Sequence, residues 1–291
     1  MKCMPERWGV SVILFRPSAE DLERLDQLRS RYPKLVVVDN SEQSLQAPPP
    51  HYETFGENRG IGAALNRAAE MARLLDCDWL LTLDQDSEFP GEQLNEFLKA
   101  FDDFPDKSNL AIFAPTYNEY DPRANDRYND VDLVMTMGNL LNLEIHAQLG
   151  GFNEELFIDE VDHEYCLRAK TNGYRVVQTR DILLRHVPGT MRTGRNGPYP
   201  YYPTHRLYTM TRNTLYLARR YYRRFPAALR GRLKGLYFAV KSKLLDEPRK
   251  LETLCTVLKG WWHNLIRRYG PPAVGRVSST PSGSSINQTK L

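Results

Sequence analysis

Four short apolar runs alternate with helix-forming segments along the first 115 residues. Each run has the length of a strand, and Leu35–Val38 is β-branched and bounded by polar residues. Strands that alternate with helices of about 10–15 residues form βαβ units, so the chain is predicted to have an α/β fold with a mostly parallel sheet. The predicted strands are 10–15, 35–38, 79–83 and 110–114, and the helices between them begin near Ser18, Gly60 and Pro90.

Carboxylates follow two of these predicted strands. Asp39 ends the second strand, and Asp84-Gln85-Asp86 ends the third. Ligands of open α/β sheets bind beyond the carboxyl ends of the strands, so these side chains are expected at one edge. Two carboxylates separated by one residue can share a divalent cation such as Mg²⁺, with water and substrate phosphates as its other ligands. The same short pattern is also common as a solvated acidic turn.

The segment that begins at Asn58 has two interpretations. The fragment Gly60-x-Gly62-x-x-Leu65 nearly matches a dinucleotide-binding fingerprint. It departs from that fingerprint because no strand leads into it and Leu65 replaces the third glycine. It therefore indicates either a small-residue helix packed on a sheet, or a helix N-terminus that offers Asn58 and backbone N–H groups to a nucleotide.

The pattern changes after residue 125. A strand-like run at 131–137 is followed by an acidic cluster at the start of a helix predicted over 162–170, and a last strand is predicted at 182–186. A carboxylate of the cluster is either a general base with a raised pKa or a solvated helix start favoured by the macrodipole. The acidic residues are Asp159, Glu160, Asp162 and Glu164.

Two members of this cluster face different directions if the segment is helical. Asp162 and Glu164 are two positions apart, so they need not share a role. His186 ends the last predicted strand, and a lone histidine there is either structural or, beside a carboxylate pair, a third metal ligand.

The charge of the chain is unevenly distributed. Residues 1–205 carry a net charge of −12, whereas residues 206–291 carry +15. The basic part has two amphipathic helical patterns, at 229–244 and 251–265, and the last 16 residues, 276–291, have the polar composition of a disordered tail. The helices either pack on the preceding domain or lie on an anionic membrane surface. Nucleic acid is disfavoured by the acidic first part and by the lack of a recognised binding module.

Other sequence features constrain the compartment. No uncharged apolar run approaches the roughly 18 residues of a membrane span, and the first residues lack a signal-peptide pattern. The four scattered cysteines are typical of reduced thiols in a cytoplasmic protein.

Seven segments between about residues 10 and 215 resemble, in their order, glycosyltransferase family 2 with the GT-A fold, and most of all its bacterial rhamnosyltransferase branch. The turn at Leu14–Pro17 and the valine at 161 depart from the usual family motifs. The matching segments are Val36–Ser41, Asn58–Asn66, Leu83–Ser87, Gly138–Leu140, Gly150–Glu154, Phe157–Arg168 and Arg206–Asn213.

The resemblance implies roles for individual residues. Asp162 would be the general base, and Asp86 and His186 would bind Mg²⁺ or Mn²⁺. The acceptor or donor-phosphate region would include Asp159, Glu164, Arg206, Tyr208 and Arg212, and the donor would contact Asp39, Asn58, Gly60, Asp84, Gln85, Gly138 and Asn139.

The resemblance also implies an activity and an organisation. We expect a Rossmann-like GT-A catalytic domain over 1–215, with a nucleotide-sugar half to about 125 and an acceptor half from 126, then a basic helical membrane-association region over 216–275. An inverting, metal-dependent transferase would move rhamnose from dTDP-rhamnose to a lipid-linked or polysaccharide acceptor. It would act as a peripheral protein on the inner face of the bacterial cytoplasmic membrane, either as a monomer or as an oligomer.

Two other functions stay open from the sequence. A nucleotidyltransferase also uses paired carboxylates at strand ends, but it has no need of the Asp162 motif. A non-catalytic, membrane-associated protein that binds sugar nucleotides would be expected to have lost the base or the paired carboxylates, and neither is lost.

Overall fold

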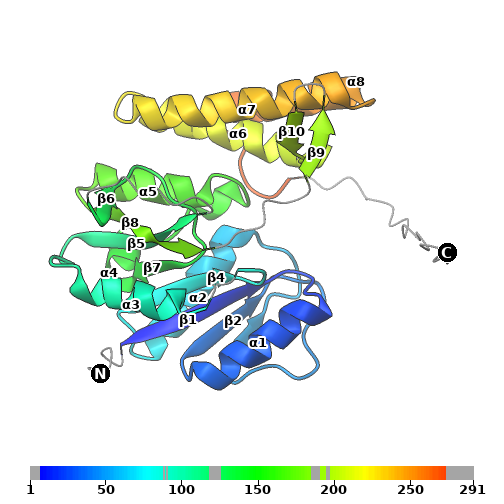
Figure 1. Ribbon diagram of the computed structural model, residues 1–291. Helices are drawn as coiled ribbons and strands as arrows, with labels where there is room; N and C mark the ends of the chain where they lie inside the picture. Colours follow the sequence, from blue (N-terminus) through cyan, green and yellow to red (C-terminus); the bar gives the residue numbers. More distant parts are fainter. Residues whose placement is uncertain are drawn as a thin grey trace, which may run out of the picture.

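A computed structural model describes residues 7–87, 89, 91–117, 126–184, 191–194 and 197–272. Its centre is an eight-stranded sheet with helices on both faces, and a layer of three helices lies beyond one end (Figure 1). The strands are β1 Trp8–Leu14, β2 Leu35–Asp39, β3 Tyr52–Thr54, β4 Trp79–Asp84, β5 Leu110–Tyr117, β6 Tyr128–Asp130, β7 Asn139–Asn142, β8 Arg175–Leu184, β9 Met191–Gly194 and β10 Gly197–Pro200. The helices are α1 Ala19–Arg31, α2 Ile61–Leu74, α3 Gln93–Asp103, α4 Leu143–Gln148, the 3₁₀ turn η1 Glu154–Leu156, α5 Val161–Thr171, α6 Thr204–Tyr221, α7 Pro226–Asp246 and α8 Lys250–Leu265.

The sheet is mixed, with the order β3-β2-β1-β4-β7-β5-β8-β6. Strands β1 to β4 pair in parallel, and β5 pairs in parallel with β8. Strand β7 is antiparallel to β4 and β5, and β6 is antiparallel to β8. The predicted α/β architecture is confirmed. The parallel strands place the ends of β2 and β4 at one edge, as the sequence indicated.

Each face of the sheet has its own apolar core. In β1, Val10 and Val12 point into one core and Ile13 into the other. Helix α2 covers the Ile13 side with small residues, and α1 and α3 cover the opposite side with Leu25 and Phe97 among others. Because the strands are buried on both faces, their sequences are continuous apolar runs and do not alternate between apolar and polar residues.

Two details of the predicted elements are wrong. Residues 131–137 do not form a strand, and β7 begins after Gly138, which has a φ of 73°. The hydroxyl of Tyr117 donates to the carbonyl oxygen of Met135 at 2.9 Å, so side chains supply hydrogen bonds that a ladder would have supplied. Residues 187–200 have the Gly- and Pro-rich sequence of a loop, yet Met191–Gly194 and Gly197–Pro200 form the paired strands β9 and β10.

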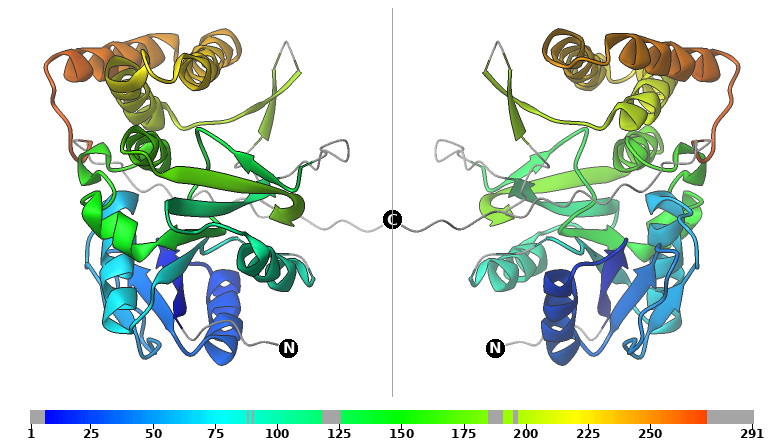
Figure 2. Two further views of the ribbon diagram at one scale, coloured as in Figure 1. Left: turned by 90° about the vertical axis from the view of Figure 1, so that its left-hand side faces the viewer. Right: turned by 90° about the vertical axis from the view of Figure 1, so that its right-hand side faces the viewer.

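Helices α6, α7 and α8 form the separate layer, and α5 lies between α6 and the sheet (Figure 2). The expected boundary at residue 215 lies inside α6. The two basic amphipathic segments are helical, as predicted. In the part of the chain that the structure describes, no helix is both long and apolar enough to cross a bilayer.

The two basic helices bury different residues. Helix α7 buries Leu229 and Lys243, and the rest of its predicted apolar stripe is half-buried. Helix α8 instead buries Thr253, Gly260 and Asn264 against its neighbours. Its own stripe is exposed, and we call this the apolar face of α8: Leu251, Leu254, Leu258, Trp261, Trp262 and Leu265.

Candidate active site

Three carboxylates converge at the carboxyl edge of the sheet. Asp84 ends β4, Asp86 lies in the turn after it, and Asp162 lies in the first turn of α5. Burial, together with the negative charges of Asp86 and Asp162, raises the pKa of Asp84 to about 7. The structure thus brings together the predicted metal-binding pair and the predicted base.

This crowding makes the ionised edge unfavourable without a cation. Because the folded protein holds the Asp84 proton more tightly than an unfolded chain does, stability falls as the pH rises from the ordinary pKa of 3.8 to about 7. The penalty is absent only below that ordinary pKa, where both states keep the proton, and it is complete above about 7. A bound cation would remove the same penalty at higher pH by compensating the negative charge.

Tyr117, at the end of β5, belongs to the same edge but was not predicted from the sequence. Burial raises the pKa of its phenol well above the usual value, and the charges of Cys166, Asp162 and Asp84 act in the same sense. Its hydroxyl donates to Oδ1 of Asn139 at 2.8 Å. Asn139, predicted to contact the donor, is 2% exposed, and its side chain is engaged within the protein.

Two predicted donor contacts are engaged within the protein. Asp39 is fully buried, and its carboxylate accepts hydrogen bonds from the amide of Ser41 at 2.9 Å and from the hydroxyl of Tyr52 at 2.8 Å. Gln85 accepts from the amide of Phe15 at 2.7 Å and donates to Asp21 at 3.1 Å. Gln85 thus ties the turn after β4 to the end of β1 and the start of α1.

The start of α2 packs against a distant motif. The Asn58 side chain accepts from the amide of Gly60 at 2.9 Å. A Cβ atom at Gly60 would lie 2.5 Å from the carbonyl oxygen of Phe157, and the amide of Ile61 donates to that same oxygen at 2.8 Å. Close packing, one of the two interpretations of this segment, therefore accounts for Gly60. The nucleotide contact of Asn58 and Gly60 stays a prediction, as does that of Gly138.

The loop that precedes Asp162 has an unusual backbone. Phe157, Asp159 and Glu160 each have a φ of +65°, in the region that favours glycine. Such a conformation costs a non-glycine residue about 1–2 kcal/mol, so the surrounding structure must hold it in place. We call residues 157–160 the left-handed loop.

Side chains of helix α6 hold the left-handed loop through backbone carbonyl groups. The side-chain amide of Asn213 donates to the carbonyl oxygens of Leu156, Ile158 and Asp159 at 2.8–2.9 Å. The guanidinium of Arg212 is 1% exposed and donates to the carbonyls of Leu156 at 3.0 Å and Gly270 at 2.7 Å. Arg212, predicted near the donor phosphates or acceptor, thus ties the residue before the loop to α6 and to the segment after α8.

The loop side chains are held as well. Arg206, another predicted residue, forms an ion pair with Asp159 at 3.0 Å, and the hydroxyl of Thr209 donates to the same carboxylate at 2.7 Å. Burial nevertheless raises the pKa of Asp159. The predicted Tyr208 lies on the other side of α6, where its hydroxyl shares a 2.8 Å hydrogen bond with His263.

Glu160 is the centre of a polar network that sequence reasoning did not assign. Its carboxylate accepts from Arg232 of α7 at 2.8 Å, from Thr214 of α6 at 2.8 Å and from His163 at 2.8 Å. Burial alone would raise the pKa of Glu160, but the hydrogen bonds and charges of His163 and Arg232 outweigh it and lower the pKa to about 2. The network fixes the residue two positions before Asp162.

Asp162 and Glu164 face different surroundings, as their spacing suggested. The side chain of Asp162 is 23% exposed, and it accepts from the amide of His163 at 2.8 Å. Glu164 is 1% exposed and accepts from Tyr221 at 2.7 Å and from Arg168 at 3.0 Å. Asp162 remains accessible to an incoming hydroxyl, and Glu164 does not.

The metal site stays a prediction. His186 lies outside the described residues, and among the described residues no three His, Cys, Asp or Glu side chains cluster closely enough to hold a metal ion. Asp84 and Asp86 fit a hard cation that keeps water and substrate phosphate oxygens as its other ligands. The observation that favours this fit is that Asp84 is buried beside the negative charges of Asp86 and Asp162, which together raise its pKa.

Part of the chain is similar to known proteins. Residues 25–153 match the family model "Glycosyl transferase family 2". A curated relative, the dTDP-rhamnosyl transferase RfbF of Shigella flexneri, is 26% identical over 205 residues, which cover 61% of this chain and 68% of the relative.

Two solved structures have a limited similarity to this chain. One is the crystal structure of GalNAc-T7 with UDP, GalNAc and Mn²⁺, with a TM-score of 0.49, 12% identity, and coverage of 62% of this chain and 43% of that one. The other is S. aureus TarS 1–349, with a TM-score of 0.46, 13% identity, and coverage of 90% and 72%. Over residues 25–153 the chain is thus similar to glycosyltransferase family 2, and its curated relative is a rhamnosyltransferase.

Proposed function

We propose that the chain is an inverting, metal-dependent hexosyltransferase with the GT-A fold that transfers rhamnose from dTDP-rhamnose to a lipid-linked glycan. The observation that carries this proposal is the convergence of Asp84, Asp86 and Asp162 at the carboxyl edge of a family 2 domain. The similarity to a dTDP-rhamnosyl transferase supports the choice of donor.

In this proposal the acceptor attacks one face of the donor sugar, and the diphosphate leaves from the opposite face. An acceptor hydroxyl is a poor nucleophile, and Asp162 would take its proton as the hydroxyl attacks the anomeric carbon. The bond to the donor diphosphate breaks on the opposite face, so the configuration at this carbon inverts. The left-handed loop would keep the Asp162 carboxylate at a fixed position relative to the donor.

Asp84 and Asp86 would hold Mg²⁺ or Mn²⁺. The ion would supply Lewis-acid stabilisation for the negative charge of the departing diphosphate. The neighbouring donor contacts proposed above are Asp39, Asn58, Gly60, Gln85 and the Gly138-Asn139 pair.

A thermal-shift panel tests the donor assignment. With Mn²⁺ present, dTDP-rhamnose at a 100-fold excess over its Kd is expected to stabilise the protein by about 2.7 kcal/mol, or roughly 5–10 °C in Tm. UDP- and GDP-sugars are expected to give smaller shifts. The Asp86→Asn variant is the control for the metal, since it should lose the Mn²⁺-dependent part. If EDTA leaves the shift unchanged, metal dependence is wrong.

We also propose that α8 places the enzyme on the inner face of the cytoplasmic membrane. The apolar face of α8 points away from α6, and Leu251, Trp261 and Trp262 are 79%, 50% and 51% exposed. Exposed basic residues, among them Lys259 and Arg268, adjoin this face. A helix with exposed tryptophans beside cations suits the interface of an anionic bilayer, where a lipid-linked acceptor would be found.

A matched pair of surface variants tests the membrane proposal. Leu251→Glu is expected to lower binding to anionic vesicles about tenfold or more, because it removes an apolar contact and adds a repelled charge. Leu74→Glu, on α2, changes a leucine of nearly equal exposure, 78% against 79%, and should bind as the wild type does. Wild-type protein that fails to sediment with the vesicles would rule the proposal out. Truncation before α7 is a poorer test, because it also removes Arg232.

A further inference from the structure

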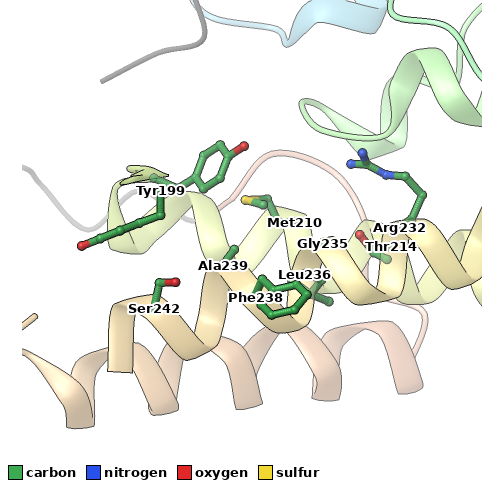
Figure 3. A pocket seen from close by; sticks show the side chains of 10 residues that line it. Tyr199, Met210, Thr214, Arg232, Gly235, Leu236, Phe238, Ala239 and Ser242 are labelled. Atoms are coloured by element: carbon green, nitrogen blue, oxygen red, sulfur yellow. The ribbon is translucent and has the colours of Figure 1, made fainter. Parts of the chain in front are cut away.

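A cavity of about 240 Å³ lies between α6, α7 and the β9–β10 ribbon (Figure 3). Tyr199 and Tyr202 come from the ribbon and the segment after it, and Leu236 and Phe238 come from α7. The wall of the cavity is therefore mostly apolar, and its polar groups are side-chain hydroxyls and a guanidinium. No role in the function proposed above involves this cavity.

The inner end of the cavity adjoins the predicted base. Thr214 and Arg232 line the cavity, and both donate to the carboxylate of Glu160, two residues before Asp162. The charge of Asp162 also acts on Arg232. Figure 3 shows the Arg232 side chain extending from α7 toward the part of the molecule that contains α5. A molecule in the cavity would thus lie close to the group proposed to deprotonate the acceptor.

The ribbon wall of the cavity is fixed to α7. Lys243 of α7 is 3% exposed and donates to the carbonyl oxygen of Tyr202 at 2.8 Å. Arg192 of β9 pairs with Glu247 at 3.4 Å and stacks on the ring of Tyr201, 3.6 Å from its centre. The cavity is therefore built by contacts that hold its opposite sides together.

We propose that this cavity binds a sugar ring of the acceptor, the unit that carries the hydroxyl to be glycosylated or the unit next to it. The inference rests on the proposed glycosyl transfer. Drug-sized ligands occupy pockets of about 300–1,000 Å³, so a cavity of about 240 Å³ suits a single ring better than a polyprenyl chain. A sugar ring has apolar C–H faces for Tyr199 and Phe238 and hydroxyls for Thr214 and Arg232.

Two glycines on α7 provide a matched test. Gly235 lines the cavity, Gly231 lies one turn earlier outside it, and a Cβ atom at either would have no neighbour within 4 Å. Gly235→Leu fills the cavity, whereas Gly231→Leu adds the same side chain elsewhere. Both changes replace a glycine inside a helix, so neither is expected to lower Tm.

The readout is the binding of methyl glycosides, followed by saturation-transfer NMR without donor. Methyl α-L-rhamnoside, β-D-glucoside, β-D-galactoside and N-acetyl-β-D-glucosaminide are suitable probes. Gly235→Leu is expected to raise the Kd of the probe that binds wild type best by roughly tenfold or more, and Gly231→Leu to leave it unchanged.

Three outcomes would overturn the cavity assignment. They are binding to Gly235→Leu as tight as to wild type, no binding of any methyl glycoside to wild type, and binding of octyl glycosides only, which would indicate an alkyl-chain site. The release of nucleoside diphosphate from dTDP-rhamnose is measured separately. Glycoside binding in the cavity without any such release would contradict the proposed transfer and leave the cavity assignment standing.

Discussion

Replacement of Asp162 by Asn is expected to lower the rate of sugar transfer by about 10²–10⁴-fold, the usual contribution of a general base. The amide has the same shape but cannot take a proton. Its oxygen can still accept the hydrogen bond from the amide of His163, so α5 should begin as before. Isothermal titration with dTDP-rhamnose and an assay of transfer are the measurements.

The two readouts separate chemistry from binding. Donor affinity should change little, because Asp162 faces the proposed acceptor side. The control is Asp181→Asn, since Asp181 pairs with Arg127 at 2.7 Å away from the carboxylate edge and should retain full transfer. An Asp162→Asn variant that transfers sugar at the wild-type rate would remove Asp162 as the base.

Asn213→Leu is expected to destabilise the protein by about 3–6 kcal/mol, which corresponds to roughly 10 °C or more in Tm. The leucine is similar in size but leaves the partly buried carbonyl groups of Ile158 and Asp159 without their donor and removes one of the donors of the buried Leu156 carbonyl. It also removes the acceptor of Arg212 Nε. Transfer should fall as well, even at temperatures where the variant stays folded, because the left-handed loop loses its support.

A second asparagine supplies the matched control. Asn172, at the end of α5, also donates its side-chain amide to a backbone carbonyl, that of Arg168 at 2.8 Å, but it is exposed to water. Asn172→Leu should cost less than about 1 kcal/mol, since water replaces the lost bond. Equal melting temperatures for the two variants would show that α6 does not hold the loop.

The sequence predicted those elements whose pattern of burial is visible in the local order of apolar residues. Strand β2 appears as Leu35–Val38 because it is buried on both faces, and α3 shows its inward stripe at helical spacing. Strand β7 was missed because only Leu140 and Leu141 are apolar between two asparagines. Its place in the sheet depends on partners far away in the chain, and local composition does not reveal them.

The candidate site was predicted in part. Asp84, Asp86 and Asp162 follow strand and helix signals, and the structure brings them together. Arg232 had no local signal, since it is one of many basic residues on the C-terminal helices, and only the fold places it on Glu160. The positive φ values of the left-handed loop could not be predicted from the sequence either. Non-glycine residues prefer negative φ values, and here tertiary contacts override that preference.

The outward direction of the α8 stripe likewise depended on tertiary structure. The stripe itself was evident from the spacing of its leucines, but either face of an isolated helix can be buried. The contact with α6 is made instead by small and polar residues such as Gly260, whose Cβ atom would lie 2.7 Å from the carbonyl oxygen of Tyr208. Nothing in their spacing marks these residues as a packing face.

The supports of the left-handed loop have a consequence for biosynthesis. The loop ends at residue 160, whereas Asn213, Arg232 and Gly270 follow it by about 50 to 110 residues in the chain. A nascent chain can therefore form the first strands of the sheet, with Asp84 and Asp86, well before the backbone around Asp162 can take its final conformation. We expect the ribosome to release a chain whose donor side folds early and whose acceptor side is completed only after translation of α8 ends.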